Sequence, residues 1–118
     1  MKLDLRENMY IRTKDGIIDK ILKLNKSYVK GVSQKDELYA YDIDNIVKAS
    51  YNIIDILEKG DYVNGYLVTY VYKPDGNEVF RIEIERDTLK GHIIDKSSQI
   101  KSIVTKEQME KMEYKVEE

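Results

Sequence analysis

The chain has 118 residues, of which 36% are charged, and its net charge at pH 7 is only −2. This near balance argues against a non-specific nucleic-acid binder and against an acidic mimic of DNA, because each would show a clear excess of one sign. There is no cysteine for disulfides or thiol catalysis, and no apolar run fits a signal peptide or a membrane span, so we expect one soluble, cytoplasmic domain over residues 1–118.

Two strands are predicted near the start of the chain. Residues 9–14 and 17–24 are separated by Asp15–Gly16, a pair that is typical of the type I′ turn of a β-hairpin. The apolar residues of 17–24 alternate imperfectly, which indicates a β-bulge or a strand that is covered on both faces. The same residues also fit helical spacing, so a helix is the rival interpretation.

Further short strands are predicted before residue 51. The candidates are residues 27–32 and 37–41, which a polar turn separates. Residues 42–47 are expected to form a bend or a single helical turn with Asp44 as its cap. The short segment 48–51 fits neither pattern clearly.

The stretch from Asn52 to Val71 carries the clearest local signal. Asn64–Gly65 separates two strand-like segments, which predicts a type I′ hairpin because both central residues of that turn need positive φ. The second segment, residues 66–73, is apolar on both faces, which indicates a central strand or a strand with a partner on its outer face. Regular alternation places four residues on one side of it: Tyr66, Val68, Tyr70 and Tyr72.

A three-strand meander is predicted from Asp61 to Arg86. After a turn at Pro74–Asn77, residues 79–86 alternate as a half-exposed antiparallel strand does. On one side lie Phe80, Ile82 and Ile84, and on the other Arg81, Glu83 and Glu85. A turn at Lys90–Gly91 and a short strand at residues 99–104 are expected to follow.

The C-terminal end carries a helix signature. Thr105 and Gln108 fit a capping box, in which two side chains satisfy free backbone N–H groups of the first turn. A short helix is therefore predicted over Lys106–Met112, with a β-bridge at residues 114–116. Together, five to seven short strands and one C-terminal α-helix predict a mainly β fold, either a small antiparallel SH3-like barrel or a strongly bent sheet.

Signals for catalysis are weak. His92 is the only histidine, and its position directly after Gly91 is typical of a surface or strand-end residue. Glu83 and Glu85 share one strand face, but the neighbouring Arg81 makes this row typical of a solvated face and not of a buried acid pair. No phosphate-binding loop, dinucleotide fingerprint or nucleophile motif is present. We therefore expect no enzyme, no catalytic residue, no metal and no cofactor.

Tyrosine is the residue type that indicates binding, with ten tyrosines against one phenylalanine. If the strand at residues 66–73 exposes its tyrosine side, it forms an apolar–aromatic strip for a partner protein or for a second copy of the chain. The alternative is that this side is the core. The candidate partner-binding residues are Tyr66, Tyr70, Tyr72 and Arg81, with Glu83 and Glu85 as polar rim contacts.

Two other classes of function are kept as alternatives. A single-stranded nucleic-acid site would use Tyr28, Lys30, Tyr39 and Tyr41, which combine aromatic and basic side chains. The missing basic excess argues against nucleic acid as the partner. A small-ligand site or an enzyme site in the mouth of a barrel would require a concave pocket lined by converging polar groups.

Three blocks of the sequence resemble a family of small proteins from phages and prophages of low-GC Gram-positive bacteria. The blocks are YIRTKDGIIDKI (Tyr10–Ile21), NIIDILEKGDYVNGY (Asn52–Tyr66) and IKSIVTKEQMEKMEYKVEE (Ile100–Glu118). The family carries no settled activity and no catalytic residues, so no residue role is transferred. The resemblance implies a non-enzymatic accessory protein that binds a host protein in the bacterial cytoplasm, for example as an anti-CRISPR inhibitor or an inhibitor of another defence enzyme.

Overall fold

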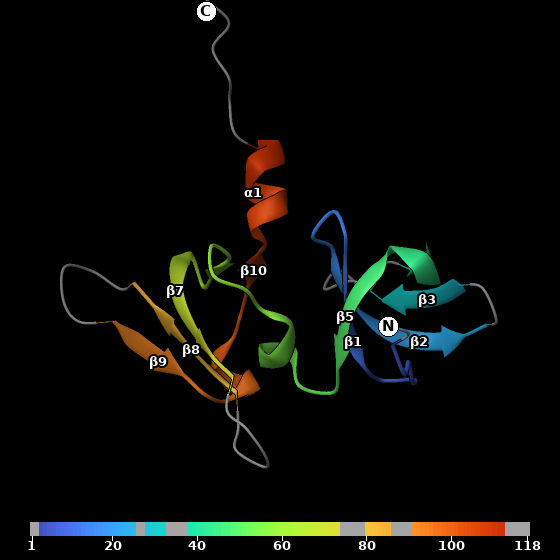
Figure 1. The fold of residues 1–118 in the computed structure, drawn as a ribbon, viewed down its shortest axis with the longest axis horizontal. Coiled ribbons are helices and arrows are strands. Elements are labelled where there is room, and N and C mark those ends of the chain that lie inside the picture. The colour runs from blue at the N-terminus through green and yellow to red at the C-terminus, as the bar shows by residue number, and fades with distance from the viewer. Residues whose placement is uncertain (1–2, 26–27, 33–37, 74–79, 86–90, 113–118) are drawn as a thin grey trace, which may run out of the picture. The chain divides into compact units, whose positions relative to one another are not determined.

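The computed structural model describes residues 3–25, 28–32, 38–73, 80–85 and 91–112. These residues form two five-stranded antiparallel sheets and one short C-terminal helix, so the predicted mainly β class is confirmed (Figure 1). The chain divides into two compact units, residues 1–56 and 57–118, and each unit holds one of the sheets. The interpretation as one domain stays a prediction. Within the described ranges, no helix is both long and apolar enough to span a membrane.

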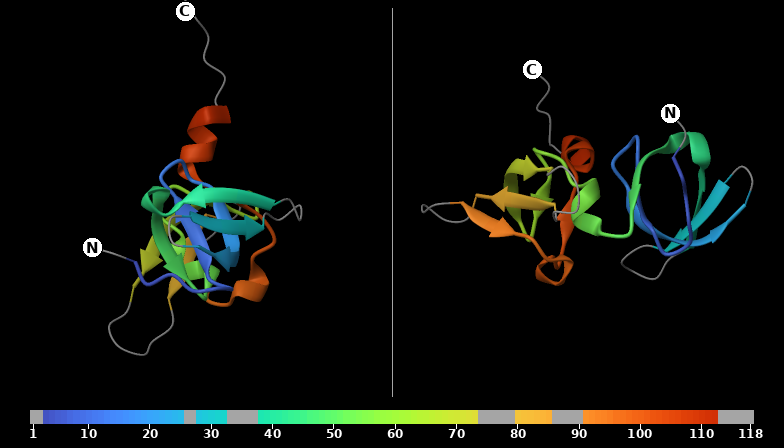
Figure 2. Two further views of the ribbon diagram at one scale, coloured as in Figure 1. Left: turned by 90° about the vertical axis from the view of Figure 1, so that its right-hand side faces the viewer. Right: turned by 60° about the horizontal axis from the view of Figure 1, so that its bottom comes forward.

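The first sheet has the strand order β4-β3-β2-β1-β5 and curls as a half-barrel, as the right-hand view of Figure 2 shows. Its core is formed by Ile11, Ile21, Val29 and Ile46, all buried. The strands are β1 (Tyr10–Thr13), β2 (Ile18–Leu24), β3 (Tyr28–Val32), β4 (Leu38–Asp42) and β5 (Ile46–Ser50), with short 3-10 helices η1 (Ile43–Asn45) and η2 (Ile53–Ile56).

The first hairpin forms as predicted, but its turn differs. Of the two turn residues only Gly16 has a positive φ, 84°, so the turn is not of type I′. Thr13 closes this turn with two hydrogen bonds. Its carbonyl accepts the N–H of Gly16 at 3.0 Å, and its Oγ1 accepts the N–H of Ile17 at 3.0 Å. The predicted bulge in β2 is confirmed by a register shift between Ile21 and Lys23, and the helix interpretation is wrong.

Around residue 44 the sequence-based prediction needs one correction. Asp44 lies inside η1 and does not cap it; Asp42 holds the N-cap position and makes no side-chain capping bond. Of the segment 48–51, which fitted no pattern, residues 48–50 belong to β5, which pairs with β1 through partners such as Ala49 and Ile11. Its strand character comes from this pairing across the sheet, which local composition does not reveal.

The second sheet has the strand order β10-β6-β7-β8-β9. Asn64 and Gly65 have φ values of 54° and 84°, so both central residues of the turn are left-handed and the type I′ hairpin is confirmed. The β6-β7-β8 meander is also confirmed. The elements are β6 (Tyr62–Val63), β7 (Tyr66–Tyr72), β8 (Arg81–Ile84), β9 (His92–Ile94), η3 (Ser97–Gln99), β10 (Ile103–Val104) and the helix α1 (Lys106–Met112).

Three predicted features around this sheet fall on residues outside the described ranges: the turn at Pro74–Asn77, the turn residue Lys90 and the bridge at residues 114–116. Two others are corrected. β9 was not predicted, and only the last two residues of the strand expected at 99–104 form β10. The helix has the predicted bounds, and its capping box is confirmed by two bonds between Thr105 and Gln108 of 3.0 and 3.3 Å.

A β-bulge in β7 decides which of its side chains share a face. Val68 lies opposite Ile84, but the next pair is Tyr70 with Glu83, so Thr69 has no opposite residue in the ladder. The prediction that Tyr66, Val68, Tyr70 and Tyr72 share one side is therefore wrong. The bulge lets the apolar Val68 and Val71, three positions apart, both face the inner side opposite Ile84 and Ile82, and it sends Tyr70 and Tyr72 outward.

Candidate functional site

The outer face of the second sheet carries a row of side chains across β7, β8 and β9. Tyr70 lies opposite Glu83, and Glu83 lies opposite Ile93. Tyr70 is 56% exposed and Ile93 is 54% exposed, although both are large and apolar or aromatic. With Tyr72 and Arg81 in the adjacent row, these residues form what we call the outer patch: Tyr70, Tyr72, Arg81, Glu83 and Ile93.

The two charged members of the outer patch, Arg81 and Glu83, lie close to neighbouring residues. Arg81 lies opposite Tyr72, and its guanidinium carbon is 4.3 Å from the centre of the tyrosine ring, which is a cation–π contact. Glu83 lies across Gly91: a Cβ at that glycine would clash with Glu83 Oε1, so a residue with a side chain at position 91 would displace the carboxylate.

The structure brings together four of the six predicted partner-binding residues in the outer patch: Tyr70, Tyr72, Arg81 and Glu83. Glu85 is exposed and directly follows β8. Tyr66 precedes the bulge and therefore lies on the inner side of the sheet. Ile93 was missed, although a run of His92 and two isoleucines directly after a glycine is a signal for a short strand.

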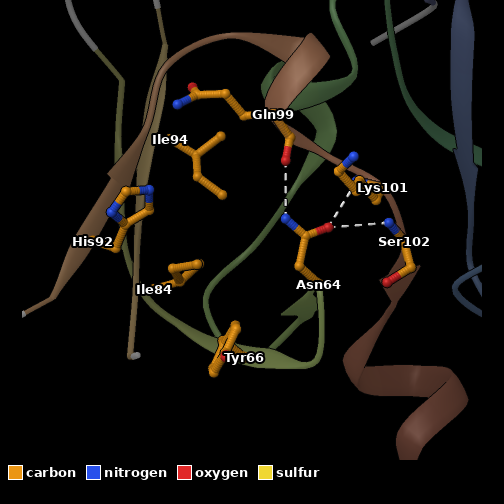
Figure 3. A pocket seen from close by; sticks show the side chains of 8 residues that line it. All are labelled: Asn64, Tyr66, Ile84, His92, Ile94, Gln99, Lys101 and Ser102. Carbon is orange, nitrogen blue, oxygen red and sulfur yellow. Dashed lines mark hydrogen bonds between the residues drawn. The ribbon is translucent and has the colours of Figure 1, made fainter. Parts of the chain in front are cut away.

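The inner side of the second unit holds a cavity of about 400 Å³. Its lining residues come from the β6-β7 turn, three strands and the segment between η3 and β10 (Figure 3). In the view of Figure 3, His92 lies across the cavity from Lys101 and Ser102, with Tyr66 at one end. The lining residues are Asn64, Tyr66, Ile84, His92, Ile94, Gln99, Lys101 and Ser102.

Asn64 fixes one wall of this cavity. Its Nδ2 donates to the Gln99 carbonyl at 2.9 Å, and its Oδ1 accepts the backbone N–H groups of Lys101 at 2.7 Å and Ser102 at 3.2 Å. The Asn64 N–H also donates to the Ser102 carbonyl at 2.9 Å. Asn64, which adopts the left-handed conformation that the turn requires, thus also binds residues 99–102 to that turn.

The residues of the alternative nucleic-acid site do not share one face. Tyr41 lies opposite the buried Val29, so Tyr41 and Tyr39 are on the core side of the first sheet, whereas Tyr28 and Lys30 are on the other side. The rings of Tyr39 and Tyr41 are tilted by 44° with centres 6.4 Å apart. The aromatic and basic groups are therefore not arranged as one stacking surface.

Tyr41 is also bound to an acid. Its hydroxyl donates a hydrogen bond to Asp19 Oδ2, and Gly31 leaves room for the pair, because a Cβ there would meet Asp19 Cβ at 3.0 Å. Burial raises the pKa of Asp19, and the hydrogen bond from Tyr41 opposes that shift. Burial raises the pKa of Tyr41 well above its ordinary range, and the bond to Asp19 adds to this. A carboxylate at this position disfavours a phosphate group.

Among the residues that the structure describes, no group of three acidic or histidine side chains is placed to hold a metal ion. The fold and its surfaces thus define a small β protein with an exposed patch on one face of a sheet and a cavity on the other. Comparisons of the chain with family models, with curated proteins and with solved structures find no match.

Proposed function

We propose that the chain is a non-enzymatic binding protein whose outer patch contacts a protein of a bacterial host. The observation that carries this proposal is the exposed pair Tyr70 and Ile93, which flank Glu83 across three strands. Grouped large side chains on an exposed sheet face are typical of interfaces, and tyrosine and arginine are enriched among the residues that dominate binding energy.

The chemistry of the outer patch favours a protein partner. Its centre is aromatic and aliphatic, and its polar groups are one guanidinium and one carboxylate, which matches the apolar core and polar rim of protein interfaces. The contact of Arg81 with Tyr72 restricts these two side chains before binding. Less conformational entropy is therefore lost when a partner docks.

The resemblance to phage and prophage proteins supports the choice of partner. We infer that the chain, as a small protein of such an element, would act by occupying a surface of a host enzyme. Inhibition of a defence enzyme, such as a CRISPR nuclease, is the form of this function that we propose. The outer patch would then cover a surface that the enzyme needs for its own substrate.

The test is capture of a stoichiometric partner from a lysate of a low-GC Gram-positive bacterium, followed by measurement of the Kd with matched variants. We expect Tyr70→Ala to weaken binding by tenfold or more, because a central interface tyrosine contributes about 2 kcal/mol or more. Tyr51→Ala is the control, since Tyr51 lies in the first unit and is 57% exposed, as Tyr70 is at 56%. Equal binding by the Tyr70 variant, or equal loss in the control, would contradict the proposal.

A second copy of the chain is the alternative occupant. Sedimentation equilibrium distinguishes it from a host protein, because a self-associating patch gives a dimer that Tyr70→Ala dissociates. We expect a monomer at micromolar concentration. A dimer lost in the Tyr70 variant would replace the host protein as the partner of the outer patch.

A further inference from the structure

We propose that the cavity of the second unit binds a small organic anion with a flat apolar part. This inference concerns the inner side of the sheet and does not depend on the protein-binding proposal. Two kinds of compound share this chemistry, a nucleoside monophosphate and an aromatic carboxylate. The residues that carry the inference are Tyr66 for the flat part, and Lys101, His92 and Ser102 for the anion.

The apolar part of the cavity comes from the inner side of β8 and β9. Ile84 and Ile94 are buried, and in Figure 3 they lie on the same side of the cavity as His92. The ring of Tyr66 lies at one end. Ile84 and Ile94 are only 2% and 1% exposed, so the apolar surface that a ligand can still cover is that of the half-buried Tyr66, against whose ring a flat ring can stack.

The polar part of the cavity favours a negative charge. Lys101 and His92 bring basic groups to opposite sides, and Ser102 adds a hydroxyl that can donate a hydrogen bond. Among the described residues, none of the lining side chains is acidic. This local excess of donors contrasts with the net charge of −2 of the whole chain. An anion is therefore the ligand whose charge the lining complements.

The wall that carries Lys101 and Ser102 is fixed before any ligand arrives. Asn64 holds the backbone N–H groups of both residues with its side-chain oxygen, and its amide nitrogen holds the Gln99 carbonyl. A preformed wall spares a ligand the cost of ordering a loop. The volume of about 400 Å³ is near the lower end of the range of small-molecule sites, roughly 300–1,000 Å³. It fits one ring system with one anionic group.

The experiment is a titration of the ¹⁵N-labelled chain followed by amide chemical shifts, with adenosine 5′-monophosphate and phenylacetate as the two probes. We expect one of them to bind with a Kd below about 1 mM and to shift the amides of Asn64, His92, Lys101 and Ser102. Which of the two binds distinguishes a phosphate from a carboxylate ligand. Adenosine and inorganic phosphate, the separate halves of the first probe, should each bind at least tenfold more weakly than a binding monophosphate.

Matched charge variants test the assigned anion contact. Lys101→Gln should weaken the binding probe at least tenfold, whereas Lys59→Gln, at an exposed lysine of the same unit that does not line the cavity, should leave the Kd unchanged. Folding is checked in the same spectra by the amides of α1. No shift at the cavity with either probe, equal weakening by the two variants, or inorganic phosphate binding as tightly as the monophosphate would overturn the inference.

Discussion

Asp19 and Tyr41 show how a single glycine shapes the interior of the first unit. Asp19 is only 4% exposed, and its carboxylate reaches the Tyr41 hydroxyl across Gly31. A buried carboxylate is costly when charged, and burial raises its pKa for this reason. The hydrogen bond from Tyr41 compensates only part of that cost. Ionisation of Asp19 therefore disfavours the folded state.

This pair predicts a pH dependence of stability with a defined sign. Because the pKa of Asp19 is higher in the folded than in the unfolded chain, its contribution to stability is full at acidic pH and is lost as the pH rises through the folded pKa. Asp19→Asn keeps an acceptor for Tyr41 and cannot ionise. We expect the Tm of this variant, relative to the wild type, to improve as the pH is raised from 3 to 7.

Differential scanning calorimetry of both proteins across this pH range checks the prediction, and taking the difference cancels the titration of the other carboxylates. Asp19→Ala is the matched control, because it also removes the charge but leaves the Tyr41 hydroxyl without this acceptor. A difference between Asp19→Asn and the wild type that stays constant with pH would refute a raised pKa at Asp19.

At the scale of elements, the β6-β7 hairpin depends on two left-handed residues. Gly65 has a φ of 84°, and a Cβ there would meet no heavy atom within 4 Å beyond its chain neighbours, so a side chain is opposed only by the backbone conformation. We expect Gly65→Val to lower the free energy of unfolding by about 1–2 kcal/mol. Urea denaturation measures the loss.

Gly65→Asn is the matched control for this hairpin, because asparagine tolerates the left-handed region far better than valine does. It should retain most of the wild-type stability. A valine variant as stable as the wild type would show that the turn is not of type I′.

The elements predicted well from the sequence are those whose signals are local. The Asn64–Gly65 turn, the Thr105–Gln108 capping box and the helix Lys106–Met112 each depend on residues a few positions apart. The bulge at Thr69 and the strand β9 depend on partners in other strands. Regular alternation therefore correctly placed Tyr70 on the same face as Tyr72, but it wrongly placed Tyr66 and Val68 on that face too.

The two candidate sites also differ in how far local sequence patterns predict them. The outer patch was predicted in large part because Arg81 and Glu83 alternate with isoleucines in one short strand. The cavity was not predicted, because it joins residues 64–66, 84, 92–94 and 99–102, and no local pattern relates these segments. Only the structure relates two of these segments, because the Asn64 side chain accepts the backbone N–H of Lys101, 37 residues further along the chain.

At the scale of the whole chain, each unit has its own sheet, and the second unit carries both proposed binding sites. The two sites lie on opposite faces of one sheet, and β7 contributes to both. Before the bulge it sends Tyr66 to the cavity, and after the bulge it sends Tyr70 and Tyr72 to the outer patch. The bulge at Thr69 thus decides which face of the sheet each of these side chains occupies, since regular alternation would put all of them on one face. That the bulge divides β7 between two faces is the central claim.

The absence of cysteine from the chain allows the most direct test of that claim. Single cysteines are introduced by Val68→Cys and Tyr70→Cys, and their rates of reaction with a thiol reagent are compared in the folded protein. We predict that the cysteine at position 70 reacts at least about tenfold faster, because the buried one at position 68 reacts only when the structure opens. Equal rates at the two positions, with both variants folded, would contradict the bulge and the division of β7 between two faces.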